Sequence, residues 1–194
     1  MAIAILGWGS LLWDIDNLAP HVQGNWHMQG GPALPMEFSR ISPKRRMGLV
    51  VCLDATHGSP CATHAITSTR ASLAEAQADL ALRERAPLAR IGYADHKTGF
   101  GRLPVVVELV QNWCKMQGWA GAVWTDLEPN FADHTGQAFT LPAALAYLKT
   151  RQGEDLAEAY RYIQNAPIWT DTPLRRHLAV NTWWQSLNNA DFLA

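Results

Sequence analysis

Apolar residues in the first third of the chain follow the patterns expected of β-strands. Residues 2–6 form a short apolar run, residues 36–42 alternate apolar with polar side chains, and residues 47–53 are almost all apolar. Alternation is typical of a strand buried on one face, whereas an unbroken apolar run bounded by turn residues is typical of a central strand. Residues 56–60 have the composition of a turn, and a further strand is predicted over residues 62–67.

The period changes to that of an α-helix over residues 72–85. The residues that recur every three or four positions and mark one face of this helix are Leu73, Ala76, Leu80 and Glu84. Ser72 is placed to cap the start, with Glu75 three residues later as in a capping box, and Pro87 follows the end. The segment therefore predicts an amphipathic helix whose inward face includes a carboxylate.

The second half of the chain predicts two more strands and then helices. The valine-rich residues 103–110 and the apolar residues 120–126 are both predicted as strands that complete the sheet. Helices are predicted over residues 142–149, after a Thr140 cap, and over residues 156–165.

Composition and charge narrow the class of protein. The chain has 194 residues, 48% of them hydrophobic, with a formal net charge of −1 and a pI near 6.6. Without repeats or long linkers, this predicts a single α+β domain over residues 1–194 and no electrostatic bias toward nucleic acid. No run approaches the ~18 apolar residues of a membrane helix, and no signal-peptide pattern opens the chain, so we expect a cytoplasmic protein without a membrane partner.

The cysteines give no sign of a disulfide framework or of a metal site. Cys52, Cys61 and Cys114 are too few and too scattered for a disulfide scaffold. Cys61 and His64 form the only close Cys/His pair, which falls short of the four ligands of a structural zinc site. We expect no metal, and the sequence leaves the oligomeric state open.

Candidate chemistry begins with the loop after the first strand, Gly7-Trp8-Gly9-Ser10-Leu11. Two glycines allow a tight turn and let a ligand approach the backbone N–H groups, and Ser10 adds a hydroxyl.

Three better-known loops differ from this one in residue type. A dinucleotide-binding loop would need a glycine at Leu12, and a phosphate loop would need a Gly-Lys-Ser/Thr sequence. A serine-hydrolase elbow would also need a glycine at Leu12.

Residues 7–13 resemble the Tyr-Gly-Ser-Leu loop of γ-glutamylcyclotransferase-like proteins, especially the ChaC-type branch. In that branch a helix ending in Tyr-Leu-x-x-Arg-Glu and then a Gly-Tyr pair follow the loop. This chain has Asp79-Leu80-Ala81-Leu82-Arg83-Glu84 and then Gly92-Tyr93 in the same order. The resemblance covers the first half of the chain well and the second half loosely.

The resemblance implies a small mixed closed β-barrel with surrounding helices. It also implies an enzyme that cyclises a γ-glutamyl amine, amino acid or peptide to 5-oxoproline and releases the attached amine, without a metal or organic cofactor. Glu84 takes the place of the family's general acid/base, and the substrate-binding loop falls on Gly7 to Leu11, with Trp8 in the tyrosine position. Residues 124–131 have no counterpart that we can place in the family pattern.

The chemistry of this reaction requires these residue types. The α-amine of the substrate arrives protonated near neutral pH and must lose a proton before its nitrogen can attack the side-chain carbonyl. A carboxylate can accept that proton and later return one to the leaving nitrogen. Helical spacing places Glu84 on the inward face and its neighbours Arg83 and Arg85 about 100° to either side. The alternative role for an inward Glu84 is a structural buried salt bridge.

Arg40 is a second candidate for substrate binding. Strand alternation places Phe38, Arg40 and Ser42 on one face, and Glu37, Ser39 and Ile41 on the other. The guanidinium of Arg40 could bind a substrate carboxylate through two parallel hydrogen bonds, or it could serve as an edge-strand ion-pair residue. Because Trp8 replaces the loop tyrosine, one alternative function is a non-catalytic small-molecule binding protein of the same fold. Another is an enzyme of the same fold that acts on another amide or amine donor.

Overall fold

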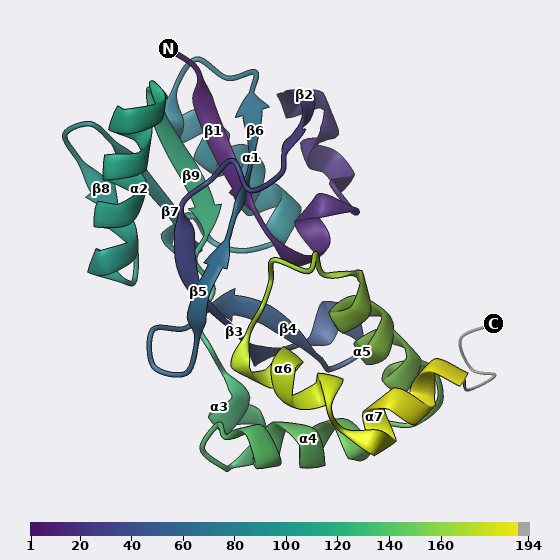
Figure 1. Cartoon of the computed structure of the whole chain (residues 1–194). Coiled ribbons are helices and arrows are strands. Elements are labelled where there is room, and N and C mark those ends of the chain that lie inside the picture. The colour runs from purple at the N-terminus through teal and green to yellow at the C-terminus, as the bar shows by residue number, and fades with distance from the viewer. Residues whose placement is uncertain (190–194) are drawn as a thin grey trace. The chain divides into compact units, whose positions relative to one another are not determined.

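The computed structural model describes residues 1–189, in which the chain divides into two compact units (Figure 1). The first unit comprises Met1–Leu34 and Ala62–Leu127, and the second comprises Pro35–Cys61 and Glu128–Ala194. Each unit has its own sheet and helices. The single domain over residues 1–194 stays a prediction.

The first unit is built on an open six-stranded sheet. Its strands are β1 (Ile3–Gly7), β2 (Val22–His27), β6 (His64–Ser68), β7 (Ile91–Asp95), β8 (Gly99–Phe100) and β9 (Gly121–Thr125). They lie in the order β2-β6-β1-β9-β7-β8. β1 pairs antiparallel with β6 and parallel with β9, so the C-terminal ends of β1 and β9 lie at the same edge of the sheet.

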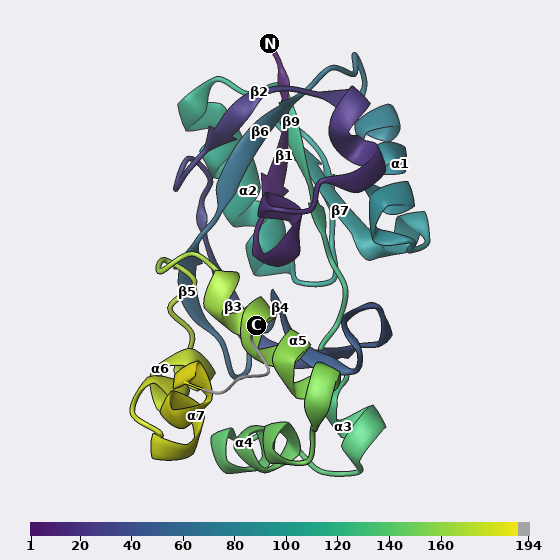
Figure 2. The same ribbon diagram turned by 90° about the vertical axis from the view of Figure 1, so that its right-hand side faces the viewer.

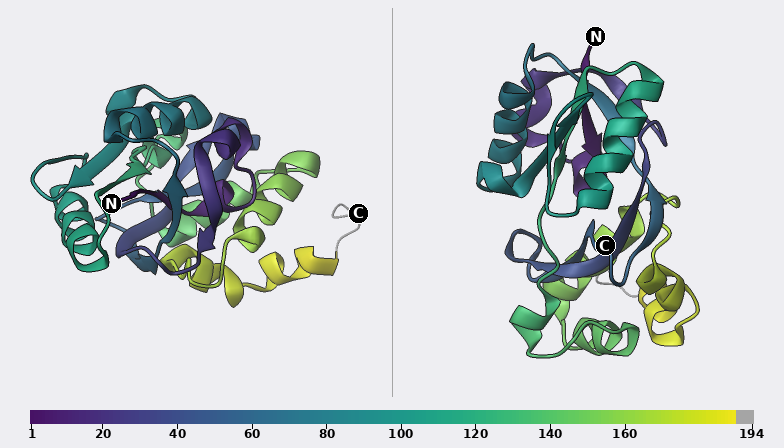
Figure 3. Two further views of the ribbon diagram at one scale, coloured as in Figure 1. Left: turned by 90° about the horizontal axis from the view of Figure 1, so that it is seen from above. Right: turned by 90° about the vertical axis from the view of Figure 1, so that its left-hand side faces the viewer.

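Two helices, α1 (Leu73–Glu84) and α2 (Pro104–Gln117), lie on opposite faces of this sheet (Figures 2 and 3). Ala76, Leu80 and Ala81 of α1 pack in one core with strand residues such as Ile5 and Val123. The unit also has three short 3-10 helices, η1 (Gly9–Leu12), η2 (Asp16–His21) and η4 (Leu88–Arg90).

The α+β class is confirmed, but residues 1–189 do not form the closed barrel that the resemblance implied. β2 and β8 are the outer strands of the six-stranded sheet and have no pairing with each other. A barrel requires its sheet to close on itself. β8 has only two residues, and the segment predicted as a strand next to it is helical, so the sheet gains no further strand there.

The strand predicted over residues 103–110 is wrong because helical packing outweighs the strand preference of valine. Pro104 lies in the first turn of α2, where its missing N–H is not needed for a helical hydrogen bond. The buried side chains of α2 follow helical spacing: Val106, Val110, Trp113 and Cys114. Strand propensity is a weak, context-dependent preference, and here burial of one helical face decides the structure.

The helix predicted over residues 72–85 is confirmed as α1. The Ser72 Oγ accepts a hydrogen bond from Glu75 N at 3.3 Å, as in a capping box, and the Glu75 carboxylate accepts its return bond from the Ser72 hydroxyl at 2.7 Å. The helix ends at Glu84 because Arg85 takes the left-handed conformation, with φ of 54°.

Up to residue 189, the second unit combines a three-stranded sheet with five α-helices. Its strands, in the order β4-β3-β5, are β3 (Ala33–Ser42), β4 (Gly48–Leu53) and β5 (Ser59–Ala62). Its α-helices are α3 (Phe131–Thr135), α4 (Leu141–Lys149), α5 (Gly153–Asn165), α6 (Pro173–Ala179) and α7 (Thr182–Ser186), and its 3-10 helices are η3 (Pro43–Arg45) and η5 (Leu187–Asn189). α5 packs on β4, where a Cβ on Gly48 would lie 3.4 Å from Ala159.

Both helices predicted in the second half are confirmed. Thr140 caps α4, with its Oγ1 accepting a hydrogen bond from Ala143 N at 3.2 Å. α5 begins three residues earlier than predicted, and Glu154 and Asp155 lie in its first turn, where the helix dipole favours negative charge.

A β-bulge breaks the alternation predicted for residues 36–42. The pairing of β3 with β4 shifts register between Glu37 and Arg40. Glu37, Phe38 and Ser39 are all fully buried: Phe38 packs against Tyr162 of α5, and Glu37 Oε2 accepts a hydrogen bond from Leu174 N of α6.

The remaining strand predictions match the structure closely. Residues 2–6, 47–53 and 120–126 correspond to β1, β4 and β9, and residues 62–67 correspond mainly to β6. Within residues 1–189, no helix has both the length and the apolar composition needed to cross a membrane.

Candidate functional site

The glycine-serine loop lies directly after β1, in the first unit. Gly9 has φ of 53°, a backbone conformation that favours glycine, and it begins the short helix η1. The Ser10 carbonyl accepts hydrogen bonds from Trp13 N at 3.3 Å and Asp14 N at 2.8 Å, which closes the turn.

Gly7 is needed for packing as well as for flexibility. A Cβ added at Gly7 would lie 2.3 Å from the indole of Trp26, so only a glycine allows Trp26 to lie against this part of β1. The space that the missing side chain leaves is therefore filled by the protein itself.

Of the five predicted loop residues, Ser10 is the most accessible. Gly7, Trp8, Gly9 and Leu11 are buried, whereas Ser10 is half-buried. Leu11 belongs to the same core cluster as Leu80 and Ala81 of α1. The hydroxyl of Ser10 makes no hydrogen bond with residues 1–189, so it is the side-chain group of this loop that can take a ligand.

Glu84 is the last residue of α1, on the stripe that begins with the buried Ala76 and Leu80. Its side chain is 15% exposed, and its Oε1 accepts a hydrogen bond from Arg83 Nη1 at 2.7 Å. The other carboxylate oxygen, Oε2, accepts no hydrogen bond from residues 1–189. Glu84 is thus held through one oxygen while the second remains available.

Arg83 departs from the prediction. Helical spacing was expected to turn it away from the inward face, but its side chain is only 2% exposed. Besides its bond to Glu84, its Nη2 donates to the backbone carbonyl of Asp14. One guanidinium therefore connects the end of α1 to the segment that follows the Gly9–Ser10 turn.

His64 lies opposite Gly7 in the antiparallel pairing of β1 with β6. It is fully buried, and its Nδ1 accepts a hydrogen bond from Gln29 N at 2.9 Å. Burial lowers the pKa of His64 to about 4, so the ring is neutral near pH 7.

Asp126 follows β9 at the edge where β1 also ends. It is buried and accepts a hydrogen bond from the backbone N–H of Arg102. Sequence reasoning did not identify His64 or Asp126 as neighbours of the loop, because only the parallel pairing of β1 with β9 and the pairing of β1 with β6 bring them to this edge.

Arg40 belongs to the second unit, whereas the loop and Glu84 belong to the first. It is half-buried on β3, and its Nη1 donates to the backbone carbonyl of Glu128. At least one of its donors therefore serves the structure of the second unit. The site described here consists of first-unit residues.

A serine, an aspartate and a histidine also gather in the second unit, but their geometry is that of a turn. Asp54 Oδ2 accepts from Ser39 Oγ at 2.7 Å and lies 3.2 Å from His57 Nδ1, while its Oδ1 accepts from the N–H groups of Thr56 and His57. Burial alone would raise the pKa of Asp54, but these hydrogen bonds hold it below its usual value. In a serine nucleophile with its base, histidine lies between the serine and the aspartate. Here Asp54 lies between Ser39 and His57, so this arrangement anchors the turn after β4.

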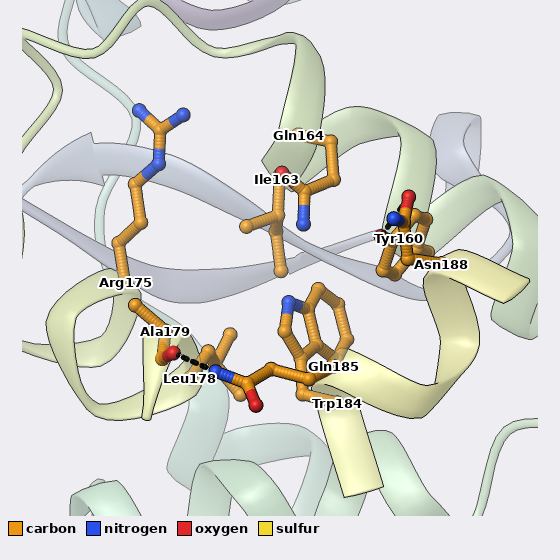
Figure 4. A pocket seen from close by; sticks show the side chains of 9 residues that line it. All are labelled: Tyr160, Ile163, Gln164, Arg175, Leu178, Ala179, Trp184, Gln185 and Asn188. Carbon is orange, nitrogen blue, oxygen red and sulfur yellow. Dashed lines mark hydrogen bonds between the residues drawn. The ribbon is translucent and has the colours of Figure 1, made fainter. Parts of the chain in front are cut away.

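The second unit also has a cavity of about 460 Å³ between α5, α6 and α7 (Figure 4). Its lining residues are Tyr160, Ile163, Gln164, Arg175, Leu178, Ala179, Trp184, Gln185 and Asn188. Arg175, its one charged lining residue, donates to the carbonyls of Ala166, Pro167 and Thr170. Because these bonds hold the segment that joins α5 to α6, the guanidinium has a structural use.

No group of three or more His, Cys, Asp or Glu side chains in residues 1–189 is arranged to hold a metal ion. Comparison of the chain with protein-family models, curated proteins and solved structures finds no match.

Proposed function

We propose that this chain is a γ-glutamylcyclotransferase-like enzyme that converts a γ-glutamyl amine, amino acid or peptide to 5-oxoproline and the free amine. The reaction uses Glu84 as its acid/base and the Gly7–Leu11 loop to hold the γ-glutamyl group. It needs no metal or organic cofactor, and we expect it in the cytoplasm.

In this reaction the α-amine nitrogen of the substrate attacks its own γ-carbonyl carbon. A carbon–nitrogen bond forms within a five-membered ring, and the amide bond to the leaving amine breaks. The attacking nitrogen loses two protons between its ammonium form and the N–H of the ring. Glu84 accepts them in turn and passes them to the leaving nitrogen, which departs as an ammonium, so atoms and protons balance without water. Because the attack is intramolecular, the protein mainly has to hold the reactive conformation.

The observation that carries the proposal is how the two carboxylate oxygens of Glu84 are hydrogen-bonded. Its Oε1 is held by Arg83 at 2.7 Å, whereas its Oε2 accepts no hydrogen bond from residues 1–189. A general base needs a fixed orientation and one free oxygen, and Glu84 has both. The Ser10 hydroxyl and the backbone of the Gly9 turn supply donors on the connected loop segment.

The test is release of 5-oxoproline from glutathione, γ-glutamyl dipeptides and γ-glutamyl amines. We expect Glu84→Gln, which keeps the shape but removes the base, to lower kcat by roughly 10² or more. Glu108→Gln, which changes an exposed glutamate on α2, is the matched control and is expected to keep wild-type turnover. Equal turnover in wild type and Glu84→Gln would exclude Glu84 as the acid/base.

A second candidate function is binding of a γ-glutamyl compound without turnover. The Arg83–Glu84 ion pair favours it, because a buried arginine needs a carboxylate partner for structural reasons alone. Calorimetric binding of a γ-glutamyl compound by a wild-type protein that releases no 5-oxoproline would support this function over the enzymatic one.

A further inference from the structure

Arg83 is the most buried charged side chain near the proposed acid/base. Its side chain is 2% exposed, and Glu84 is its only ion-pair partner among residues 1–189. A charge taken out of water is costly unless an opposite charge and hydrogen bonds compensate it. The carboxylate of Glu84 therefore has to stay close to Arg83 in the folded protein.

The contact between these two residues is not the usual outcome of helix geometry. Consecutive helical residues point about 100° apart and do not normally face each other. Here α1 ends at Glu84, because Arg85 takes the left-handed conformation. At this helix end, Arg83 Nη1 donates a hydrogen bond of 2.7 Å to Glu84 Oε1, so the two neighbouring side chains meet.

The same guanidinium also sets the position of the loop segment. Its Nη2 donates to the backbone carbonyl of Asp14, whose own N–H is bonded to the Ser10 carbonyl at 2.8 Å. Leu11 packs with Leu80 and Ala81 from α1 in one core. Arg83 thus joins two segments by hydrogen bonds: the end of α1 and the segment after the Gly9–Ser10 turn. The proposed reaction needs these two segments in a fixed arrangement.

We propose that Arg83 is a positioning residue that holds Glu84 at a set place relative to the Gly9–Ser10 turn, so that the free Oε2 can reach the α-amine of a bound γ-glutamyl group. This inference rests on the proposed function. Misplacement of a catalytic group by about 1 Å can cost 10²-fold in rate, so loss of this link is expected to affect the chemical step.

The experiment compares kcat and KM for wild type, Arg83→Lys and Arg83→Gln, with Arg85→Gln as the matched control. Arg85 is the exposed neighbour at the end of the same helix. We expect Arg83→Gln to lower kcat by roughly 10²-fold with KM changed by less than about threefold. Arg83→Lys keeps the positive charge, but its single ammonium cannot bond both the Glu84 carboxylate and the Asp14 carbonyl. We therefore expect it to keep only part of the wild-type kcat. We expect Arg85→Gln to match wild type.

A double variant separates positioning from a general loss of structure. If Arg83 acts through Glu84, adding Arg83→Gln to Glu84→Gln lowers the remaining turnover no further. Additive losses, or a full wild-type kcat in folded Arg83→Lys or Arg83→Gln, would overturn the inference. If Arg83→Gln does not fold, the kcat of Arg83→Lys decides whether the inference holds.

The two proposals fail in different ways. No turnover in wild type would overturn the proposed function and this inference with it. Turnover that depends on Glu84 but not on Arg83 would overturn this inference alone.

Discussion

At the residue scale, burial determines which partners the titratable side chains Arg83 and His64 require. Arg83 is buried beside a carboxylate that compensates its charge. His64 is buried with its Nδ1 accepting a hydrogen bond, which is a role that only the neutral ring can play. Neither behaviour can be recognised from residue type, because surface arginines and histidines are far more common than buried ones.

His64 makes the stability of the fold sensitive to acid. Its pKa is about 4 in the folded chain against 6.5 for a free histidine, so the unfolded chain binds more protons between these values. The contribution of His64 to the free energy of unfolding is therefore fully present above pH 6.5. It is lost as the pH drops toward 4, by up to about 3 kcal/mol. Urea unfolding between pH 4.5 and 7.5 measures this slope.

Replacement of His64 identifies its share of that slope. We expect His64→Gln, which keeps an acceptor for Gln29 N, to flatten the dependence of the unfolding free energy on pH. His134→Gln removes an exposed histidine of α3 and is expected to leave the slope unchanged. An unchanged slope in His64→Gln would rule out His64 as its source.

At the element scale, the helices that have a side-chain cap and a clear period, α1 and α4, were predicted from the sequence, whereas α2 was not. The capping box of α1 and the Thr140 cap of α4 are local hydrogen bonds that the sequence can specify directly. α2 has no side-chain cap and begins with a valine-rich turn, so its identity depends on the face it buries. Valine content alone was a poor guide to this element.

The cap of α1 has a measurable contribution to stability. We expect Ser72→Ala to lower the unfolding free energy by about 1 kcal/mol, because the N–H of Glu75 loses its acceptor. Ser72→Asp keeps an acceptor at the same place and should remain close to wild type in urea unfolding. Equal losses in both variants would show that the hydrogen bond is not the cause.

At the scale of the whole molecule, the chain crosses between its two units three times, after Leu34, Cys61 and Leu127. If one unit unfolded, its segments would remain joined to the other unit at these three positions. Each unit has its own sheet, so whether the two units unfold together as the single domain predicted over residues 1–194 is a question for experiment.

The three buried cysteines can test this prediction. Cys114 lies in the first unit, and Cys52 and Cys61 lie in the second. Burial raises the pKa of Cys61 and raises that of Cys114 to about 12, so their thiols should be unreactive in the folded chain at pH 8.

We expect all three thiols to become reactive at the same urea concentration. Variants that keep one cysteine each, with serine at the others, report the two units separately when a thiol reagent is added along a urea series. Coincident transitions would support a single domain. Separate transitions for Cys114 and for Cys52 and Cys61 would contradict it and show two independently unfolding units.

The sequence by itself determined the elements whose signals are local. These are β1, β4, β9, α1 with its cap, and α4, together with the Gly7–Leu11 turn and the inward direction of Glu84. Each depends on residues within a few positions of one another, where periodicity, capping and glycine conformation act directly.

Only the tertiary structure decided the features that depend on distant segments. Packing against the sheet made residues 104–117 a helix, and parallel pairing of β1 with β9 brought Asp126 to the edge where β1 ends. Burial turned Arg83 inward to join Glu84 with Asp14. The physical reason is that burial and strand pairing join residues far apart in the chain, and no local pattern specifies which distant backbone group a buried side chain will bond.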